Sequence, residues 1–146
     1  MTIRRAAVSD APALLELWKS AEASPSPTDT RADLERALGN DALACFVAEA
    51  DGVLAGSIIA AFDGWRAHVY RLAVRPEARR RGVARRLVDA AHAAFAAWGA
   101  RRVTALVEKD HPWAISFWRA VGYAPDERIS RFLMNLPPSS GGAAGG

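Results

Sequence analysis

The sequence lacks most of the features that mark secreted or membrane proteins. Cys45 is its single cysteine, so no disulfide can form within the chain. No run approaches the roughly 20 apolar residues that span a bilayer, and the N-terminus has no apolar stretch of the signal-peptide kind. These absences argue against a disulfide-stabilised secreted module and a membrane-spanning chain. We therefore expect a cytoplasmic protein with no membrane partner.

Charge is also scarce when it is summed over the whole chain. The 146 residues carry a formal net charge of only +3, and their arginines gather at residues 79–86 and 101–102. This pattern suits a small, local anionic ligand. With 51% apolar residues the chain can build one packed core. We expect one domain over residues 1–136, followed by a disordered tail at residues 137–146, which has neither charge nor large side chains.

Hydrophobic periodicity and turn residues predict an alternation of strands and helices. One helix is capped by Ser9 or Asp10, and others start at Thr30, after Gly82 and at Pro112. Strands are expected at residues 2–7, 45–50, 53–62, 66–74, 102–108 and 129–136. This order predicts a mixed α/β domain.

Two local patterns sharpen this prediction. The dipeptide Asp51-Gly52 lies between the second and third expected strands and is a strong hairpin signal. In the strand at residues 66–74, side chains alternate between the two faces of a sheet. We therefore expect one face to carry His68, Tyr70, Leu72 and Val74.

A strand, a basic glycine loop and a helix follow one another from Leu72 to Ala84. The loop reads Arg79-Arg80-Arg81-Gly82, and the helix begins at Val83. A helix start leaves unpaired N–H groups with a partial positive charge, and a glycine lets a diphosphate approach the backbone closely. Arginines add charge around these amides. The order predicts an anion site, with a solvated basic helix entry as the alternative.

Two motifs in this order resemble the Gcn5-related N-acetyltransferase (GNAT) family. The motifs are Leu72-x-Val74 with Arg79-x-x-Gly82-x-Ala84, and Ala114-x-x-Phe117-Trp118-x-x-x-Gly122-Tyr123. The resemblance covers residues 2–136. It implies a mixed, mostly antiparallel central sheet of six to seven strands flanked by four helices. It also implies transfer of an acetyl group from acetyl coenzyme A (acetyl-CoA) to a primary amine within a ternary complex.

The resemblance further implies which residues bind the coenzyme. The glycine loop would hold the diphosphate, and the preceding strand would offer backbone groups to the pantetheine arm and the acetyl carbonyl. A backbone N–H aimed at the thioester oxygen would stabilise the oxyanion by about 3 kcal/mol. His111 replaces an Asn common in relatives. The implied binding residues are Leu72, Ala73, Val74, Arg79, Arg80, Arg81, Gly82, Val83, Ala84 and His111, and no metal is implied.

Acetyl transfer needs a deprotonated amine, and hence a base or a water relay. His68 is the first candidate, because it lies on the strand leading to Leu72, at about the place where some relatives carry a glutamate. Glu108, at the end of the next expected strand, is the second candidate and would act through water. A partly buried His68 satisfied by a neighbouring backbone group is an equal alternative.

Two departures from the family pattern, His111 and Trp118, affect the mechanism. Trp118 stands where relatives have the Tyr often proposed to protonate the departing thiolate, and an indole cannot act as that acid. The thiolate of coenzyme A is a good leaving group that water can protonate. We therefore expect Trp118 to be a wall or core residue. Tyr70 and Tyr123 could supply a hydroxyl, although packing is the expected role of both.

The resemblance places the acceptor pocket near the first two helices, their Pro-rich loop, the strand at residues 66–74 and residues 126–128. Acidic side chains there would attract a cationic amine, or would simply form a solvated helix face. The first of these regions carries Trp18, Glu22, Asp29 and Asp33. The run Asp63-Gly64-Trp65-Arg66 is similar to that of an uncharacterised bacterial subgroup and names no substrate.

Two other classes of function compete with an enzyme. A nucleic-acid-binding module would explain the arginines, but no aromatics are interleaved with them and no known motif is present, so we expect no nucleic-acid partner. A coenzyme sensor without transfer is the stronger rival, given His111 and Trp118. Within the enzyme class, protein amines, polyamines, amino acids and aminoglycosides all stay open as acceptors. A homodimer through the last strands also stays open, because exposed strand edges can pair.

Overall fold

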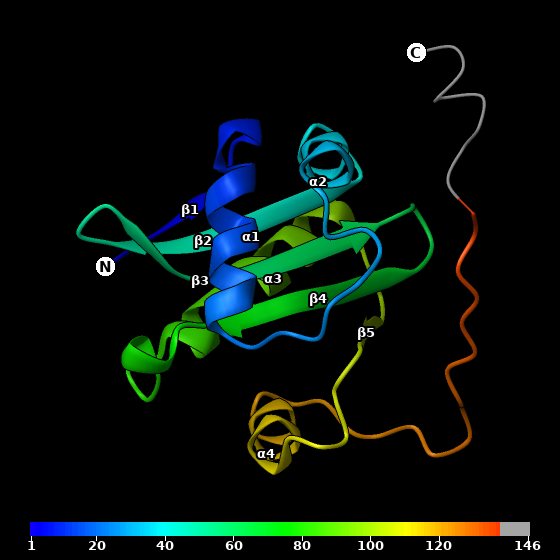
Figure 1. Cartoon of the computed structure of the whole chain (residues 1–146). Coiled ribbons are helices and arrows are strands. Elements are labelled where there is room, and N and C mark those ends of the chain that lie inside the picture. The colour runs from blue at the N-terminus through cyan, green and yellow to red at the C-terminus, as the bar shows by residue number, and fades with distance from the viewer. Residues whose placement is uncertain (138–146) are drawn as a thin grey trace.

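A computed structural model of the chain describes residues 1–137. One sheet contains, in the order β1-β2-β3-β4-β5, the strands Thr2–Arg5, Leu43–Ala50, Val53–Phe62, Ala67–Val74 and Val103–Ala105 (Figure 1). The helices are α1 Ala11–Ser20, α2 Arg31–Leu38, α3 Val83–Trp98 and α4 Pro112–Ala120, with 3-10 turns at Val8–Asp10 and Pro76–Ala78. The predicted α/β class is confirmed. The tail expected at residues 137–146 lies, except for Pro137, outside the described residues.

Local sequence signals fix several of these elements. The Asp33 N–H donates to Oγ1 of Thr30 at 3.1 Å and so caps the start of α2. Between β2 and β3, Asp51 and Gly52 have φ of +53° and +76°. Positive φ at both central residues is what a two-residue type I′ turn requires. The predicted hairpin is confirmed.

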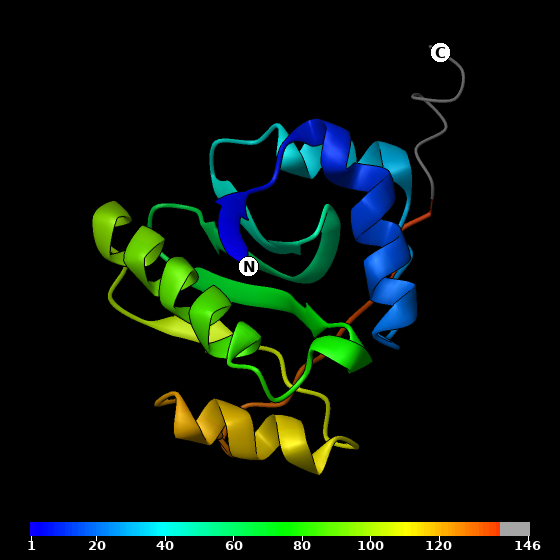
Figure 2. The ribbon, with the colours of Figure 1, turned by 90° about the vertical axis from the view of Figure 1, so that its left-hand side faces the viewer.

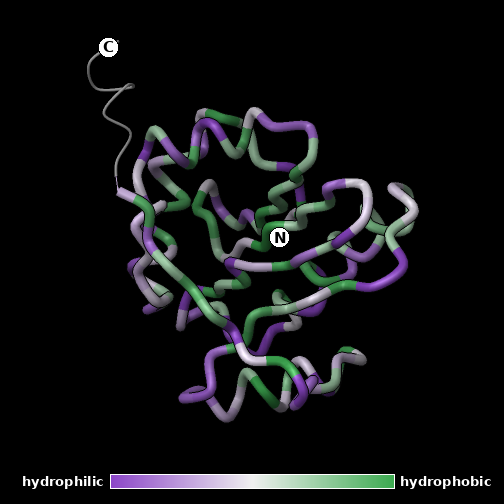
Figure 3. The backbone as a smooth tube through the Cα atoms, turned by 90° about the vertical axis from the view of Figure 1, so that its right-hand side faces the viewer, coloured by the Kyte–Doolittle hydropathy of each residue, from purple (hydrophilic) through white to green (hydrophobic). Residues whose placement is uncertain are grey.

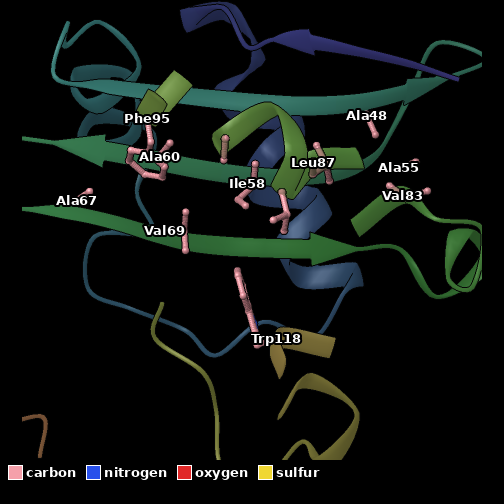
Figure 4. Close-up of a cluster of buried hydrophobic side chains, with 12 residues drawn as sticks. Ala48, Ala55, Ile58, Ala60, Ala67, Val69, Val83, Leu87, Phe95 and Trp118 are labelled. Atoms are coloured by element: carbon pink, nitrogen blue, oxygen red, sulfur yellow. The ribbon is translucent and has the colours of Figure 1, made fainter. Parts of the chain in front are cut away.

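The sheet is covered on both faces, with α1 and α2 on one face and α3 on the other (Figure 2). The core on the α3 face includes Ile58, Val69, Val83, Leu87, Val88, Ala91 and Phe95 (Figure 4). The core on the α1 face includes Leu14, Leu17, Trp18, Leu34, Val47 and Ile59. Burial of each large aliphatic side chain contributes about 1.5–3 kcal/mol. The two cores therefore hold the sheet rigidly from both sides.

β4 and β5 run parallel but pair only briefly. The paired residues are Ala67 with Val103, His68 with Thr104 and Val69 with Ala105. β5 then ends and the chain turns toward α4, whereas β4 continues to Val74 (Figure 1). On that side, the backbone of residues 70–74 has no strand partner within the described chain. The strand expected at residues 102–108 is thus shorter than predicted.

A bulge interrupts β4 at Arg71. Ile59 of β3 pairs with Tyr70, but Ser57, two residues earlier in β3, pairs with Ala73, three residues later in β4. Arg71 has a φ of +55°, which is rare for a residue with a side chain. β4 therefore contains one residue more than the matching part of β3, as in a β-bulge.

The bulge corrects one prediction about faces. Because one extra residue reverses the alternation of side chains beyond it, β4 presents different faces before and after the bulge. Tyr70 packs against the core on the α1 face, whereas Leu72 and Val74 pack against the core on the α3 face. The expectation that these three residues and His68 share one face is wrong.

The strand expected at residues 129–136 does not form in the described structure. Residues 129–136 follow an irregular path after α4 (Figure 3). Their large apolar side chains are 66–95% exposed. A strand needs a partner for its backbone groups, and a favourable local pattern alone does not supply one. The sheet of the described residues therefore has five strands, where six to seven were expected.

Candidate active site

The basic glycine loop leads into α3, and its backbone conformation can present N–H groups to a ligand. Arg80 and Gly82 have φ of +63° and +75°, and successive turns of this kind aim N–H groups into one concavity. Backbone hydrogen bonding at the start of α3 begins with the Arg86 N–H, which donates to the Gly82 carbonyl at 3.1 Å. The earlier N–H groups of α3 have no acceptor within the helix. The loop can therefore receive an anion at the positive end of the helix.

Gly56 in β3 lets the start of α3 approach the sheet. A Cβ at this position would lie 3.0 Å from the Ala73 carbonyl oxygen, 3.0 Å from Leu87 Cδ1 and 3.1 Å from Val83 Cγ1. These distances are too short for an ordinary contact. Gly56 therefore lets the start of α3 lie close to β3 and to the end of β4. Sequence reasoning missed it, because a glycine inside a strand carries no sign of what lies above it.

The three loop arginines were predicted to bind the coenzyme together, but their side chains have different contacts. Arg80 and Arg81 are exposed beside the amides. Arg79 instead contacts the protein: its Nε donates to the Val74 carbonyl at 3.2 Å and its Nη2 donates to the Ala21 carbonyl at 3.3 Å. Its guanidinium also lies 5.6 Å from the centroid of the Trp113 ring. Arg79 thus connects the ends of α1 and β4 with the start of α4.

The end of β4 offers its backbone to a ligand. The side chains of Leu72 and Val74 pack into the core on the α3 face, and Ala73 packs into the core on the α1 face. Their backbone groups on the β5 side have no strand partner among residues 1–137. This stretch directly precedes the anion loop, so an extended ligand whose anionic end occupies the loop can run along it.

A buried hydrogen-bond chain supports the bulge. Ser57 Oγ donates to the Arg71 carbonyl at 2.8 Å and accepts from Nε1 of Trp18 at 2.9 Å. Ser57 is fully buried, and these two bonds satisfy its hydroxyl. The chain ties α1 to the strained residue of β4. Sequence reasoning took Trp18 for a pocket or core residue and passed over Ser57, since nothing local reveals a bulge.

The side chain of Arg71 reaches the loop between α1 and α2. Its Nη2 lies 2.6 Å from Oδ1 of Asp29, and its Nη1 donates to the Ser24 carbonyl at 3.0 Å. The guanidinium also lies 4.8 Å from the centroid of the Trp18 ring. Residues 21–30 were expected to border the acceptor, and the structure attaches them to the bulge.

Glu108 lies on the other side of the same loop. Hydrogen bonding from Ser24, with a further contribution from His111, holds the pKa of Glu108 below its ordinary value. Oε2 of Glu108 lies 2.7 Å from Nε2 of His111, the residue that caps α4. The carboxylate is therefore ionised at neutral pH. Ser24 thus contacts both the bulge arginine and the acid that was predicted as a second base.

His68 lies elsewhere. It pairs with Ala61 on one side and with Thr104 on the other, within the closed part of the β4–β5 ladder. The bulge and the free backbone of β4 begin beyond it. Of the two predicted bases, Glu108 is therefore the one that lies with the bulge and the loop.

The aromatic residues of the second motif are mainly structural. Trp118 is 8% exposed and belongs to the core on the α3 face, as expected of a wall or core residue. The Tyr123 ring packs edge-on against Trp118, and its hydroxyl is 2.7 Å from Nε2 of His92. Burial raises the pKa of Tyr123 to about 12 and also raises that of Tyr70. Both hydroxyls stay protonated at neutral pH.

The acidic residues near the expected acceptor pocket are mostly engaged. Asp33 belongs to the cap of α2 and lies 3.0 Å from Nη1 of Arg36. Asp126 pairs with Arg128 at 3.2 Å on the exposed segment after α4. As Asp29 is bound by Arg71, these carboxylates are not arranged as one acidic pocket.

Other functional groups do not gather into a second site. Within residues 1–137, no three His, Cys, Asp or Glu side chains lie close enough to hold a metal ion. Burial raises the pKa of Cys45 to about 12, so its thiol is not a ready nucleophile. None of the helices described here combines the length and the apolar character that crossing a membrane requires.

Comparison with known sequences agrees with this geometry. Residues 11–123 match the model of the Acetyltransferase (GNAT) family. The chain is 30% identical over 129 residues to Acetyltransferase YE1169 of Yersinia enterocolitica, which covers 88% of this chain and 92% of that protein. It is also 30% identical over 123 residues to Acetyltransferase ECA0875 of Pectobacterium atrosepticum, with 84% and 87% covered.

Solved structures share the fold. The aminoglycoside acetyltransferase meta-AAC0020 from an uncultured soil metagenomic sample, in complex with sisomicin, has a TM-score of 0.78 and 22% identity, with 93% of this chain and 96% of that chain covered. AAC(6')-Iy in complex with a bisubstrate analogue containing coenzyme A has a TM-score of 0.77 and 24% identity, with 92% and 98% covered. At these identities the likeness extends to the fold alone.

Proposed function

The chain belongs to the GNAT family of acetyltransferases, and on that premise we propose that it transfers an acetyl group from acetyl-CoA to a primary amine. One observation carries the coenzyme assignment. The free backbone of β4 leads directly into an amide-lined loop at the start of α3, where Gly82 and Arg80 have positive φ. A diphosphate suits the loop and a pantetheine arm suits the strand.

We expect the acetyl group to pass directly from acetyl-CoA to the amine. The amine nitrogen attacks the thioester carbon, the C–N bond forms and the C–S bond breaks, and the sulfur leaves with its electron pair as the thiolate. Holding both substrates together supplies much of the rate. A backbone N–H of β4 near the bulge would stabilise the oxyanion.

We propose Glu108 as the base, directly or through one water, ahead of His68. Its carboxylate is ionised at neutral pH and lies beside Ser24 of the acceptor loop, with His111 at 2.7 Å to receive the proton onward. Glu108→Gln should lower kcat at least tenfold with little change in the dissociation constant of acetyl-CoA, while His68→Ala should lower it less. The reverse order would assign the base to His68.

The test of the function begins with binding. Calorimetric titration with acetyl-CoA at two salt concentrations should show saturable binding. Gly82→Glu should abolish it, because the side chain fills the concavity and its charge repels the diphosphate. Gly82→Ala is the matched control, since it imposes the same strain at positive φ without the charge and retains measurable binding. Equal affinity for the wild-type and Gly82→Glu proteins would refute the loop assignment.

The second step separates an enzyme from a sensor. Thiol release is followed against a panel of primary amines, including tyramine, spermidine, sisomicin and peptides with free N-termini. Turnover supports the acetyltransferase. Tight binding of acetyl-CoA with no thiol release would favour the alternative, a regulatory module that senses the coenzyme. A cytoplasmic location and a homodimer both stay predictions.

A further inference from the structure

Arg71 joins the strained backbone of β4 to the loop between α1 and α2. Its carbonyl accepts from Ser57, and its guanidinium holds Asp29 at 2.6 Å and the Ser24 carbonyl at 3.0 Å. The side chains of Arg71 and Asp29 are 16% and 24% exposed, so water screens this pair less than a surface pair. The same residue thus shapes the bulge and fixes the loop.

This contact also decides which charges face the loop. Asp29 is the acidic residue of residues 21–30 that lies against the bulge, and Arg71 neutralises it. Glu16 of α1 is bound in the same way by Arg75. Glu108 keeps only its histidine partner and Ser24. Of the two carboxylates that lie against Ser24 and Arg71, Asp29 is therefore bound by an arginine and Glu108 is not.

From this arrangement we propose that Arg71 determines acceptor specificity: by neutralising Asp29 and fixing residues 21–30, it selects an amine with one positive charge over a polycation. The proposal rests on the proposed function, because an acceptor must exist for its charge to matter. A single ammonium can pair with Glu108, to which no arginine is bound. The additional ammonium groups of a polyamine meet a neutralised Asp29 and the guanidinium of Arg71.

The test removes the positive charge at position 71. Arg71→Met keeps an apolar stem against Trp18 and removes the cation, so Asp29 becomes a free carboxylate. The measured quantity is the ratio of kcat/KM for tyramine, with one ammonium, to kcat/KM for spermidine, with three. The ratio should favour tyramine in the wild-type protein and fall by about tenfold in Arg71→Met. A loss of packing alone would lower both rates and leave the ratio in place.

A second substitution identifies the source of the change. Asp29→Asn in the Arg71→Met background removes the freed charge and should restore the ratio toward that of the wild-type protein. Hydrogen exchange of residues 21–30 should be faster in both variants, because the loop has lost its ion pair. If the ratio stays low in the double variant, Asp29 does not set the specificity and the proposal fails.

Arg75→Met is the matched control. Arg75 has a similarly buried guanidinium, with 14% exposure, and its carboxylate partner is Glu16 rather than a loop residue. The control should leave the ratio and the exchange of residues 21–30 unchanged. An equal change of ratio in Arg71→Met and Arg75→Met would overturn the proposal. No thiol release by the wild-type protein with any amine of the panel refutes the proposed function itself, whereas turnover with an unchanged ratio refutes only the role of Arg71.

Discussion

The first hundred residues and the last quarter of the described chain are built differently. Residues 2–98 contain four of the five strands, and helices bury both faces of their sheet. Residues 103–137 contribute one short strand, one helix and a long exposed segment. Contacts of this second part with the first include the packing of Trp118 of α4 and the hydrogen bond between Tyr123 and His92. The first part forms the basic glycine loop and the bulge, while the second contains Glu108.

The two parts differ in how far apart in the sequence their contacting residues lie. In the first part, short turns join β2 to β3 and β3 to β4, so local residues determine these two antiparallel pairings. In the second part, β5 pairs with β4 although the whole of α3 separates the two strands in the sequence. No tight turn directs the segment after α4 to a strand edge of the sheet. Contacts over such sequence separations carry a larger entropic cost of closure. The first part should therefore hold most of the stability.

The largest expected difference between the two parts is in the cost of losing a leucine side chain. Leu87 of α3 is fully buried, whereas Leu133 is 66% exposed. Leu87→Ala should lower the free energy of unfolding by about 2–5 kcal/mol, because it leaves a cavity in the core. Leu133→Ala should change it by less than about 0.5 kcal/mol. Urea denaturation measures both. A large loss from Leu133→Ala would show that the C-terminal segment is buried in solution.

The same contrast explains how far the sequence could predict the fold and the site. The Asp51-Gly52 hairpin, the Thr30 cap and the glycine loop are local patterns, and the structure contains each of them. The bulge at Arg71 depends on the register between two strands, which no local pattern of β4 records. For that reason the predicted faces were wrong beyond Tyr70, and Ser57 was missed as a functional residue.

Contacts between sheet and helix give a second comparison, within the first part. Gly56→Ala would place a Cβ 3.0 Å from the Ala73 carbonyl oxygen, and the backbone there cannot move without disturbing β4. We expect a loss of about 1–3 kcal/mol in the free energy of unfolding. Gly39→Ala is the control, because its Cβ would meet atoms no closer than 3.5 Å at ordinary φ. Equal stability of the two variants would show that α3 lies farther from β3 than it does in the structure.

Ion pairs of the first part should also stabilise the protein more than those of the second part. Oδ1 and Oδ2 of Asp10 accept from the Arg4 guanidinium at 2.9 and 2.8 Å, and this bonding lowers the pKa of Asp10. A lowered pKa in the folded state stabilises the protein above pH about 4, and that contribution disappears as the pH falls through the folded value. Asp10→Asn should therefore lower the free energy of unfolding by about 1–2 kcal/mol at pH 7.

The measurement for this pair is urea denaturation between pH 2 and pH 7. The difference between the wild-type and Asp10→Asn proteins should vanish at the acid end, where both side chains are neutral. Asp126→Asn is the control from the second part, where the carboxylate is exposed and water screens its pair with Arg128. It should show no resolvable dependence on pH. An equal effect from both variants would remove the distinction between the two parts.

The smallest expected effect concerns a side-chain hydrogen bond between the two parts. Tyr123→Phe removes the 2.7 Å contact with Nε2 of His92 and should lower the free energy of unfolding by about 1 kcal/mol near pH 8. Burial raises the pKa of Tyr123 to about 12, whereas an unfolded tyrosine titrates near 10. Between these values the folded state binds more protons than the unfolded state, so the stability of the wild-type protein should fall as the pH rises. The Phe variant should lack this part of the slope. Identical slopes for the two proteins would mean that the Tyr123 hydroxyl is solvated and does not help to attach the second part to the first.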